Sequence, residues 1–307
     1  MNVRFTYFFR ILFLTTVCCF GSFAQSLTGN QVVEVPFDFY RNEIILRVKV
    51  NGKGYFNMML DTGTDPSAVD LATAKEIGLR LASTGHQGTG SGTSVNLAYE
   101  TKLPLVEIGD LAAKNVKAVA IDLSKVSERL GKPIHGVLGH SLLSSRIVQI
   151  DYPKGVVRFY SKSPFPKPAN QPYNSKLTTL SFRYHDNILI DGVSVNGKKI
   201  TANFDTGSNG SFQLTPDAVT NLGLNDEVSK AQVRKSVGYN GEAENREGKI
   251  KNVTIGGISI DEPSVLFFGE GAGHDKKAWG INLGNAFLKD FIVTIDYLSK
   301  MITLEKP

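Results

Sequence analysis

The motif Leu60-Asp61-Thr62-Gly63-Thr64 has a second copy, Phe204-Asp205-Thr206-Gly207-Ser208, 144 residues further along the chain. A single Asp-Thr-Gly is weak evidence, because common residues would produce one by chance in roughly one case in fifteen for a chain of this length. Here both copies follow an apolar run, Tyr55–Leu60 or Ile200–Phe204, of the kind that predicts a buried β-strand. The sequence therefore predicts two related segments that each present one aspartate at the end of a strand.

The repeat extends well beyond these motifs, with a period near 145 residues. Val50-Asn51-Gly52-Lys53 recurs as Val195-Asn196-Gly197-Lys198, and Ile150-Asp151-Tyr152 recurs as Ile295-Asp296-Tyr297. Between the copies, residues 161–180 contain four prolines, which disfavour helix and central strand and indicate an extended linker. We therefore expect a leader over 1–24, an N-terminal lobe over 25–160, a linker over 161–177 and a C-terminal lobe over 178–307.

Each lobe is expected to be built mainly of strands. Glu43–Val50 and Ile188–Val195 are β-rich runs that end at Asn-Gly, the pair favoured in hairpin turns. A short helix is expected after each aspartate, over Asp70–Ile77 and over Thr215–Leu222, where Thr215 is the N-cap and Pro216 the first residue. Short strands separated by glycine turns predict a mainly β fold with two similar β-barrel-like lobes, a cleft between them and few short helices.

Residues 1–24 are typical of a secretory signal. Arg4 and Arg10 precede an apolar run over Ile11–Phe20, and small residues precede an expected cleavage after Ala24. The alternative is an uncleaved membrane anchor, but the apolar run falls short of the roughly 20 residues that span a bilayer. We expect cleavage, a periplasmic or secreted protein and no stable membrane insertion. Both cysteines lie in this segment, so the remaining chain has no disulfide.

Composition is ordinary for a folded protein, with 41% hydrophobic and 21% charged residues. The net charge of +5 falls to +3 without the leader, and lysine and arginine are scattered without interleaved aromatics, which argues against nucleic acid as a partner. Gly192–Lys198 matches part of a P-loop, but Lys199 replaces the required Ser or Thr. The five histidines show no zinc-binding pattern, so we expect neither metal nor cofactor.

Taken together, the two motifs and the repeat resemble the aspartic peptidases of the pepsin and retropepsin group. The resemblance also rests on apolar turns that end at Gly139 and Gly284, and it covers most of residues 43–305. It is closest to two retropepsin-like units fused in tandem, as in secreted two-lobed proteins of Gram-negative bacteria. It implies an endopeptidase that cleaves polypeptides with a water molecule activated by Asp61 and Asp205. Two carboxyl groups that share one proton can supply the base and the acid of such a hydrolysis, but the sequence leaves open which aspartate holds the proton.

The resemblance also implies supporting roles in the two aspartate loops. Glycines would allow the tight turns, threonines would reach across to the other lobe's backbone, and hydroxyls would hydrogen-bond the outer carboxylate oxygens. Two further glycines would pack beside the loops. These residues are, in that order, Gly63 and Gly207, Thr62 and Thr206, Thr64 and Ser208, and Gly139 and Gly284.

A hairpin flap that covers the substrate is a further implication of the resemblance. The best candidate in the first lobe is the glycine-rich stretch Gly85–Gly92, with Gly88 and Gly90, and in the second lobe the turn at Tyr239. The alternative is that both are flexible surface turns.

The sequence departs from the family pattern at three places. His135 stands where many members have an acidic residue before the apolar turn. Asp65 adds a third carboxylate, which either faces solvent or raises the pKa of the pair. The stretch Gly280–Gly284 has one residue more than Gly136–Gly139, which predicts a distorted turn in the second lobe.

Two alternatives to a single-chain enzyme stay open. One is a non-catalytic protein that binds peptide or glycan on the same fold. The other is a homodimer in which lobes of different chains pair. We expect a monomer, because the linker is long enough for both lobes of one chain to meet.

Overall fold

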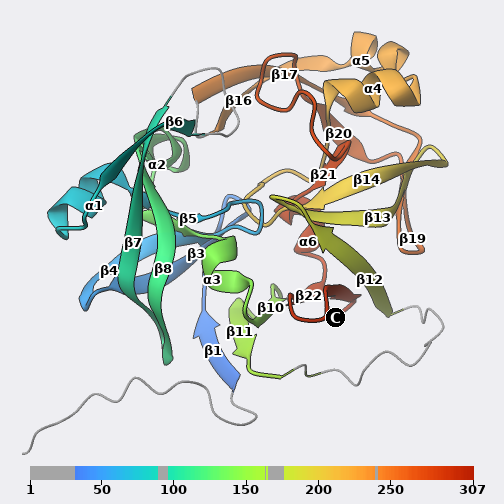
Figure 1. Cartoon of the computed structure of the whole chain (residues 1–307). Helices are drawn as coiled ribbons and strands as arrows, with labels where there is room; N and C mark the ends of the chain where they lie inside the picture. Colours follow the sequence, from blue (N-terminus) through green and yellow to red (C-terminus); the bar gives the residue numbers. More distant parts are fainter. Residues whose placement is uncertain (1–31, 89–95, 163, 165–175, 239–240) are drawn as a thin grey trace, which may run out of the picture.

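The computed structural model describes residues 32–88, 96–162, 164, 176–238 and 241–307. Strands account for 53% and helices for 14% of the described residues, so the predicted mainly β fold is confirmed. Figure 1 shows two lobes joined by a third group of strands at the base of the view. The predicted leader over 1–24 and most of the predicted linker lie outside the described residues. In the part that is described, no helix is both long and apolar enough to cross a membrane.

The N-terminal lobe is built on one sheet. Its strand order is β2 (Asp38–Tyr40), β3 (Glu43–Val50), β4 (Lys53–Leu60), β9 (Gly136–Leu138), β5 (Ser67–Asp70), β8 (Leu111–Ile121), β7 (Asn96–Ile108) and β6 (Ala82–Gly88). β9 runs parallel to β4 and antiparallel to β5. It therefore connects the strand before Asp61 to the strand that follows the aspartate loop.

The C-terminal lobe repeats this plan. Its strand order is β13 (Ile188–Val195), β14 (Lys198–Phe204), β21 (Ile281–Leu283), β15 (Phe212–Leu214), β20 (Ser264–Phe267), β17 (Gly241–Lys249) and β16 (Gln232–Gly238), and a hairpin of β18 (Asn252–Ile255) and β19 (Ile258–Asp261) is attached to β13. β21 is parallel to β14 and antiparallel to β15, as β9 is to β4 and β5. The repeat read from the sequence is thus a repeat of strand pairing.

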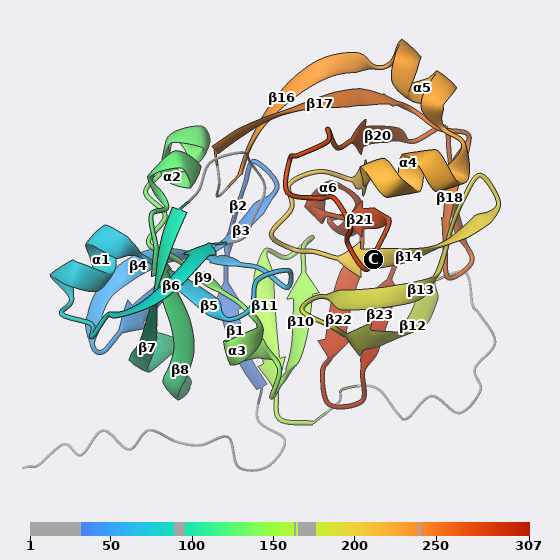
Figure 2. The ribbon, with the colours of Figure 1, turned by 45° about the horizontal axis from the view of Figure 1, so that its top comes forward.

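A bridging sheet joins the lobes and has the same strand pattern on both sides of its centre. Its order is β1 (Val32–Pro36), β11 (Val156–Tyr160), β10 (Ile147–Asp151), β22 (Ile292–Asp296), β23 (Met301–Glu305) and β12 (Leu177–Tyr184) (Figure 2). β10 and β22 pair antiparallel at the centre, with Gln149 opposite Thr294. Residues 32–36 are therefore a strand of this sheet.

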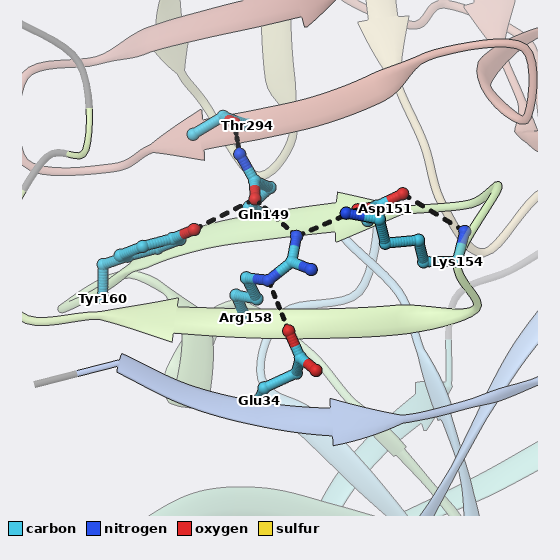
Figure 3. A network of polar contacts seen from close by, with 7 residues as sticks. All are labelled: Glu34, Gln149, Asp151, Lys154, Arg158, Tyr160 and Thr294. Carbon is cyan, nitrogen blue, oxygen red and sulfur yellow. Dashed lines mark hydrogen bonds and ion pairs between the residues drawn. The ribbon is translucent and has the colours of Figure 1, made fainter. Parts of the chain in front are cut away.

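Alternate side chains of the bridging sheet face opposite ways. One set, including Val148, Ile150 and Val293, joins the main apolar core. The other set forms the polar network in Figure 3, where Arg158 donates to Glu34 at 2.6 Å, to Gln149 at 2.9 Å and to Asp151 at 3.0 Å. Gln149 in turn donates to Thr294 at 3.0 Å, across the two halves of the repeat. Both faces of the sheet therefore hold the lobes in one arrangement.

The helices of the described residues are short: α1 (Leu71–Glu76), α2 (Ser124–Leu130), α3 (His140–Leu143), α4 (Pro216–Leu222), α5 (Asn225–Lys230) and α6 (Asn285–Leu288). Both predicted helices are confirmed. Asp70 caps α1 by accepting from the Thr73 N–H at 3.1 Å. Thr215 caps α4, with Pro216 in the first turn. The predicted Asn-Gly turns are also present, with φ of 53° and 75° at residues 51–52 and 48° and 79° at 196–197.

Candidate active site

The two predicted aspartates lie at the ends of equivalent strands and meet between the lobes. Asp61 follows β4, and its N–H donates to the Leu138 carbonyl at 3.1 Å. Asp205 follows β14, and its N–H donates to the Leu283 carbonyl at 3.0 Å. A side-chain hydrogen bond joins Asp61 and Asp205. Two residues 144 positions apart are thus brought within direct contact.

Thr62 and Thr206 lock the two aspartate loops together through four buried hydrogen bonds. The Thr62 hydroxyl donates to the Phe204 carbonyl at 2.8 Å, and the Thr206 hydroxyl donates to the Leu60 carbonyl at 3.0 Å. Each hydroxyl also accepts the other threonine's backbone N–H, at 3.0 and 3.1 Å. Each hydroxyl therefore donates to and accepts from the other lobe.

Gly63 and Gly207 are required by the opposite carboxylate rather than by an unusual backbone angle. Each N–H donates to the inner oxygen, Oδ1, of the aspartate two residues earlier, at 2.7 Å in the first lobe and 2.9 Å in the second. A Cβ on Gly207 would lie 2.1 Å from Asp61 Cγ, and one on Gly63 would lie 2.8 Å from Asp205 Oδ1. Any side chain at these positions would push the two carboxyl groups apart.

The outer oxygens are held differently in the two lobes. The Thr64 hydroxyl lies 2.6 Å from Asp61 Oδ2, as the resemblance implies. The expectation for Ser208 is wrong, because its hydroxyl donates to Gln213 Oε1 at 2.7 Å. The outer oxygen of Asp205 instead accepts from Asn282 Nδ2 at 3.0 Å.

The turns behind the loops have equal length, so the predicted distortion in the second lobe is wrong. Leu138 pairs with Leu60 in the same register in which Leu283 pairs with Phe204. Gly280 therefore matches His135, which stands one residue before the first-lobe turn. Both residues donate their N–H to the strand before the aspartate, to the carbonyls of Asn57 and Thr201.

Gly139 and Gly284 pack against the aspartate loops, where a side chain would not fit. A Cβ would lie 2.3 Å from the Thr64 carbonyl oxygen at Gly139, and 2.4 Å from the Gly210 carbonyl oxygen at Gly284. The next residue in each lobe donates its N–H to the loop, to Thr64 in the first lobe and to Ser208 in the second, at 2.8 Å in both.

The electrostatics favour retention of a proton by the pair. Asp61 is only 3% exposed, and Asp205 is partly exposed. Burial, together with the charge of Asp61, raises the pKa of Asp205 to about 7, although hydrogen bonds from Asn282 and Gly207 act to lower it. One carboxyl group can thus remain protonated under conditions where an exposed aspartate is ionised.

Comparison with known families agrees with this geometry. The model that describes the aspartyl protease family matches residues 46–142 and again residues 192–287. The chain belongs to the aspartyl protease family. No curated protein sequence matches it. Each matched region contains one aspartate of the pair, so the family match covers both Asp61 and Asp205.

Glu43 is a buried carboxyl group of this family member that the sequence reasoning missed. Its side chain is fully buried at the start of β3 and accepts from Arg129 Nη2 at 2.9 Å. Burial raises the pKa of Glu43 to about 8, against the lowering effect of Arg129, and the charges of Asp61 and Asp205 raise it further. The available signal was an acidic residue directly before the apolar run Ile44–Leu46 at the start of a strand.

Asp65, the third carboxylate near the first Asp-Thr-Gly motif, is exposed, in agreement with the predicted alternative in which it faces solvent. Its Oδ2 accepts from the Tyr184 hydroxyl at 2.9 Å, and the Tyr184 ring stacks on His140 with centroids 3.6 Å apart. Tyr184 belongs to the second lobe and the other two residues belong to the first. This cluster is therefore a contact between the lobes.

Asn285 makes the corresponding contact on the other side and was also missed. Its Oδ1 accepts from the Tyr152 hydroxyl at 2.6 Å, and its Nδ2 donates to the carbonyls of Thr206 at 2.7 Å and Asn42 at 2.8 Å. Tyr152 and Asn42 belong to the first lobe. Asn285 therefore ties the Asp205 loop to the first lobe through its side chain.

Of the flap candidates in this protease fold, Gly88 is the last residue of β6, whereas Gly90 and Tyr239 lie outside the described residues. The hairpin of β6 and β7 and that of β16 and β17 occupy equivalent places in the two lobes. Figure 2 shows the β16–β17 hairpin extending toward α2 of the first lobe, with which β16 is in contact.

In the described part of the chain, no group of three or more His, Cys, Asp or Glu side chains could hold a metal ion.

Proposed function

We propose that the protein is an aspartic endopeptidase that hydrolyses peptide bonds of polypeptides with the Asp61/Asp205 pair. The observation that supports this most directly is the hydrogen-bonded contact of the two carboxyl groups, one from each lobe, between glycines that leave no room for a side chain. A non-catalytic binding protein would have no need for two aligned acids held this closely.

The chemistry needs one proton on the pair. Asp61 as carboxylate takes a proton from a water molecule, whose oxygen attacks the peptide carbonyl carbon. Asp205, which retains its proton, donates it to the carbonyl oxygen, so that a neutral tetrahedral diol forms. When the diol collapses, the C–N bond breaks, the leaving nitrogen receives the proton that Asp61 took up, and a diol hydroxyl returns its proton to Asp205. The pair ends in its starting protonation state.

The signal-like segment over 1–24 supports a location outside the cytoplasm, periplasmic or secreted, and we infer that a monomer is the working form. N-terminal sequencing of protein exported from a Gram-negative host should find Gln25 as the first residue. A chain that retains its leader would contradict the proposed cleavage. Sedimentation that shows an obligate dimer would contradict the monomer.

Activity is tested by incubation of the purified protein with a denatured polypeptide between pH 3 and 7. Asp61→Asn and Asp205→Asn should each abolish cleavage, and Asp65→Asn, which changes an exposed carboxylate beside the same loop, should retain it. Cleavage that survives in both dyad variants would overturn the proposal. Peptide binding by the wild type without cleavage at any pH would favour the non-catalytic alternative.

A further inference from the structure

The two lobes differ in the side chains that surround the outer carboxylate oxygens. In the second lobe Asn282 lies on β21, opposite Asn203 of β14 and Gln213 of β15. The same register in the first lobe places Val137 opposite Met59 and Ala68. Three apolar residues of the first lobe thus correspond to three residues with amide side chains in the second.

The amides form a connected network. Asn282 Nδ2 donates to Asp205 Oδ2 at 3.0 Å and to Gln213 Oε1 at 2.7 Å. Its Oδ1 accepts from Asn203 Nδ2 at 2.7 Å, and Gln213 Oε1 also accepts from the Ser208 hydroxyl at 2.7 Å. Asn203 and Asn282 are 2% and 3% exposed. Every polar atom of the Asn282 side chain is therefore engaged, which fixes the orientation of its amide.

This arrangement has a consequence for the proton of the pair. A hydroxyl such as that of Thr64 can either donate to Asp61 Oδ2 or accept from it. An amide N–H can only donate, so Asp205 Oδ2 must act as an acceptor. We propose that Asn282 is a positioning residue of the dyad, which keeps the proton off the outer oxygen of Asp205 and opposes protonation of that aspartate.

The charged groups around Asp205 also affect its protonation, alongside Asn282. Asp61 faces Asp205 from the first-lobe loop, and Glu43, paired with Arg129 of α2, adds a further buried carboxyl group. Burial and Asp61 favour the protonated form of Asp205, and Asn282 opposes them. Loss of the Asn282 donor should therefore make Asp205 hold its proton to higher pH.

The inference rests on the proposed function and is tested by Asn282→Val, which installs the first-lobe residue. In the pH profile of kcat/KM, the alkaline limb should move up by about one to two pH units, because a hydrogen bond to a charged group is lost. We expect kcat to fall by about tenfold or more, because the proton is less well placed. The control is Asn252→Val, which makes the same substitution in the same lobe at a residue whose backbone N–H, not its side chain, bonds Asn196 Oδ1; it should leave the limb in place.

A rescue variant separates positioning from mere packing. Asn203→Met, Gln213→Ala and Asn282→Val together reproduce the first-lobe set and free the Ser208 hydroxyl to reach Asp205, as Thr64 reaches Asp61. This triple variant should bring the limb back toward the wild-type pH. If Asn282→Val lowers kcat but leaves the limb where it was, or if the triple variant moves it no closer to wild type, the inference is overturned.

A second readout keeps this test separate from the proposed function. Carbon-13 NMR titration of the aspartate carboxyl groups, assigned with Asp205→Asn, reports the proton of the pair without any substrate. If the wild type cleaves nothing, the proposed function fails. The inference then stands if Asn282→Val still raises the pKa of Asp205, and it fails if that pKa is unchanged.

Discussion

Glu43→Gln provides a sharp test of the electrostatics beneath the aspartate pair. The Glu43 side chain is fully buried, and its pKa in the folded protein is about 8, compared with 4.5 for an ordinary glutamate. The folded state therefore holds a proton that the unfolded chain releases above about pH 4.5. This proton contributes stability that is fully present below pH 4.5 and is lost as the pH rises through 8.

The size of the effect follows from those two values. At 1.36 kcal/mol for each pH unit, the full difference is on the order of 5 kcal/mol. Between pH 5 and pH 8, the wild-type free energy of unfolding should fall by about 3 to 4 kcal/mol from this group alone. Glutamine does not titrate, keeps an oxygen for Arg129 and removes this slope. The variant should therefore lose less stability than the wild type over that range.

The measurement is denaturant unfolding at several pH values from 5 to 8, followed by the fluorescence of Trp279. This residue is the single tryptophan of the chain and is 7% exposed. Glu34→Gln is the matched control, because the Glu34 side chain is 53% exposed in its ion pair with Arg158. It should leave the wild-type slope unchanged. Parallel stability curves for wild type and Glu43→Gln would refute the assignment of a buried, protonated Glu43.

Three further outcomes are expected. Cleavage should decline as the pH rises through about 7, since Asp205 then loses the proton that it donates. The cleavage rate constant is measured from pH 5 to 9, and a rate that is still rising above pH 8 would contradict this expectation. Gly207→Ala should lower kcat by about a hundredfold, since its Cβ would lie 2.1 Å from Asp61 Cγ and displace a reacting group; steady-state kinetics with a normal rate would disprove the crowding argument. Thr206→Val should lower the free energy of unfolding by about 2 to 4 kcal/mol, since buried hydrogen bonds to the other lobe are lost. The exposed Thr220→Val should lower it by less than about 0.5 kcal/mol, and equal losses in the two variants would argue against this contact between the lobes.

Features governed by neighbouring residues in the sequence were predictable. Glu43–Val50 and Ile188–Val195 are strands with the predicted bounds, because the apolar runs and the Asn-Gly turns that end them are local signals. The cap at Thr215 was predictable for the same reason, since its hydroxyl bonds an N–H three residues later. The contact of the two Asp-Thr-Gly loops followed from the repeat, which doubles a motif that is weak alone.

Features set by partners distant in sequence were not predictable. Ser208 stands where a hydroxyl should reach Asp205, but its orientation is decided by Gln213 on another strand. The importance of Asn282 depends on its register against β14 and β15, which the apparent extra residue at Gly280 concealed. Glu43 is part of an ordinary strand until α2 brings Arg129 against it. In each case the deciding contact is with a side chain on a neighbouring strand or helix.

The pattern of agreement and difference between the lobes has a physical reason. Thr62 and Thr206 are the same residue type, since each makes the same contact with the other lobe and two different side chains could not make both contacts alike. A pair of carboxyl groups that shares one proton is asymmetric in charge even where its backbone is symmetric. A fixed chemical difference between the two aspartates arises at positions that touch one of them and not the other. Position 282, where the other lobe has Val137, is such a position, and its amide makes Asp205 chemically distinct from Asp61 while the two loops keep the same backbone hydrogen bonds.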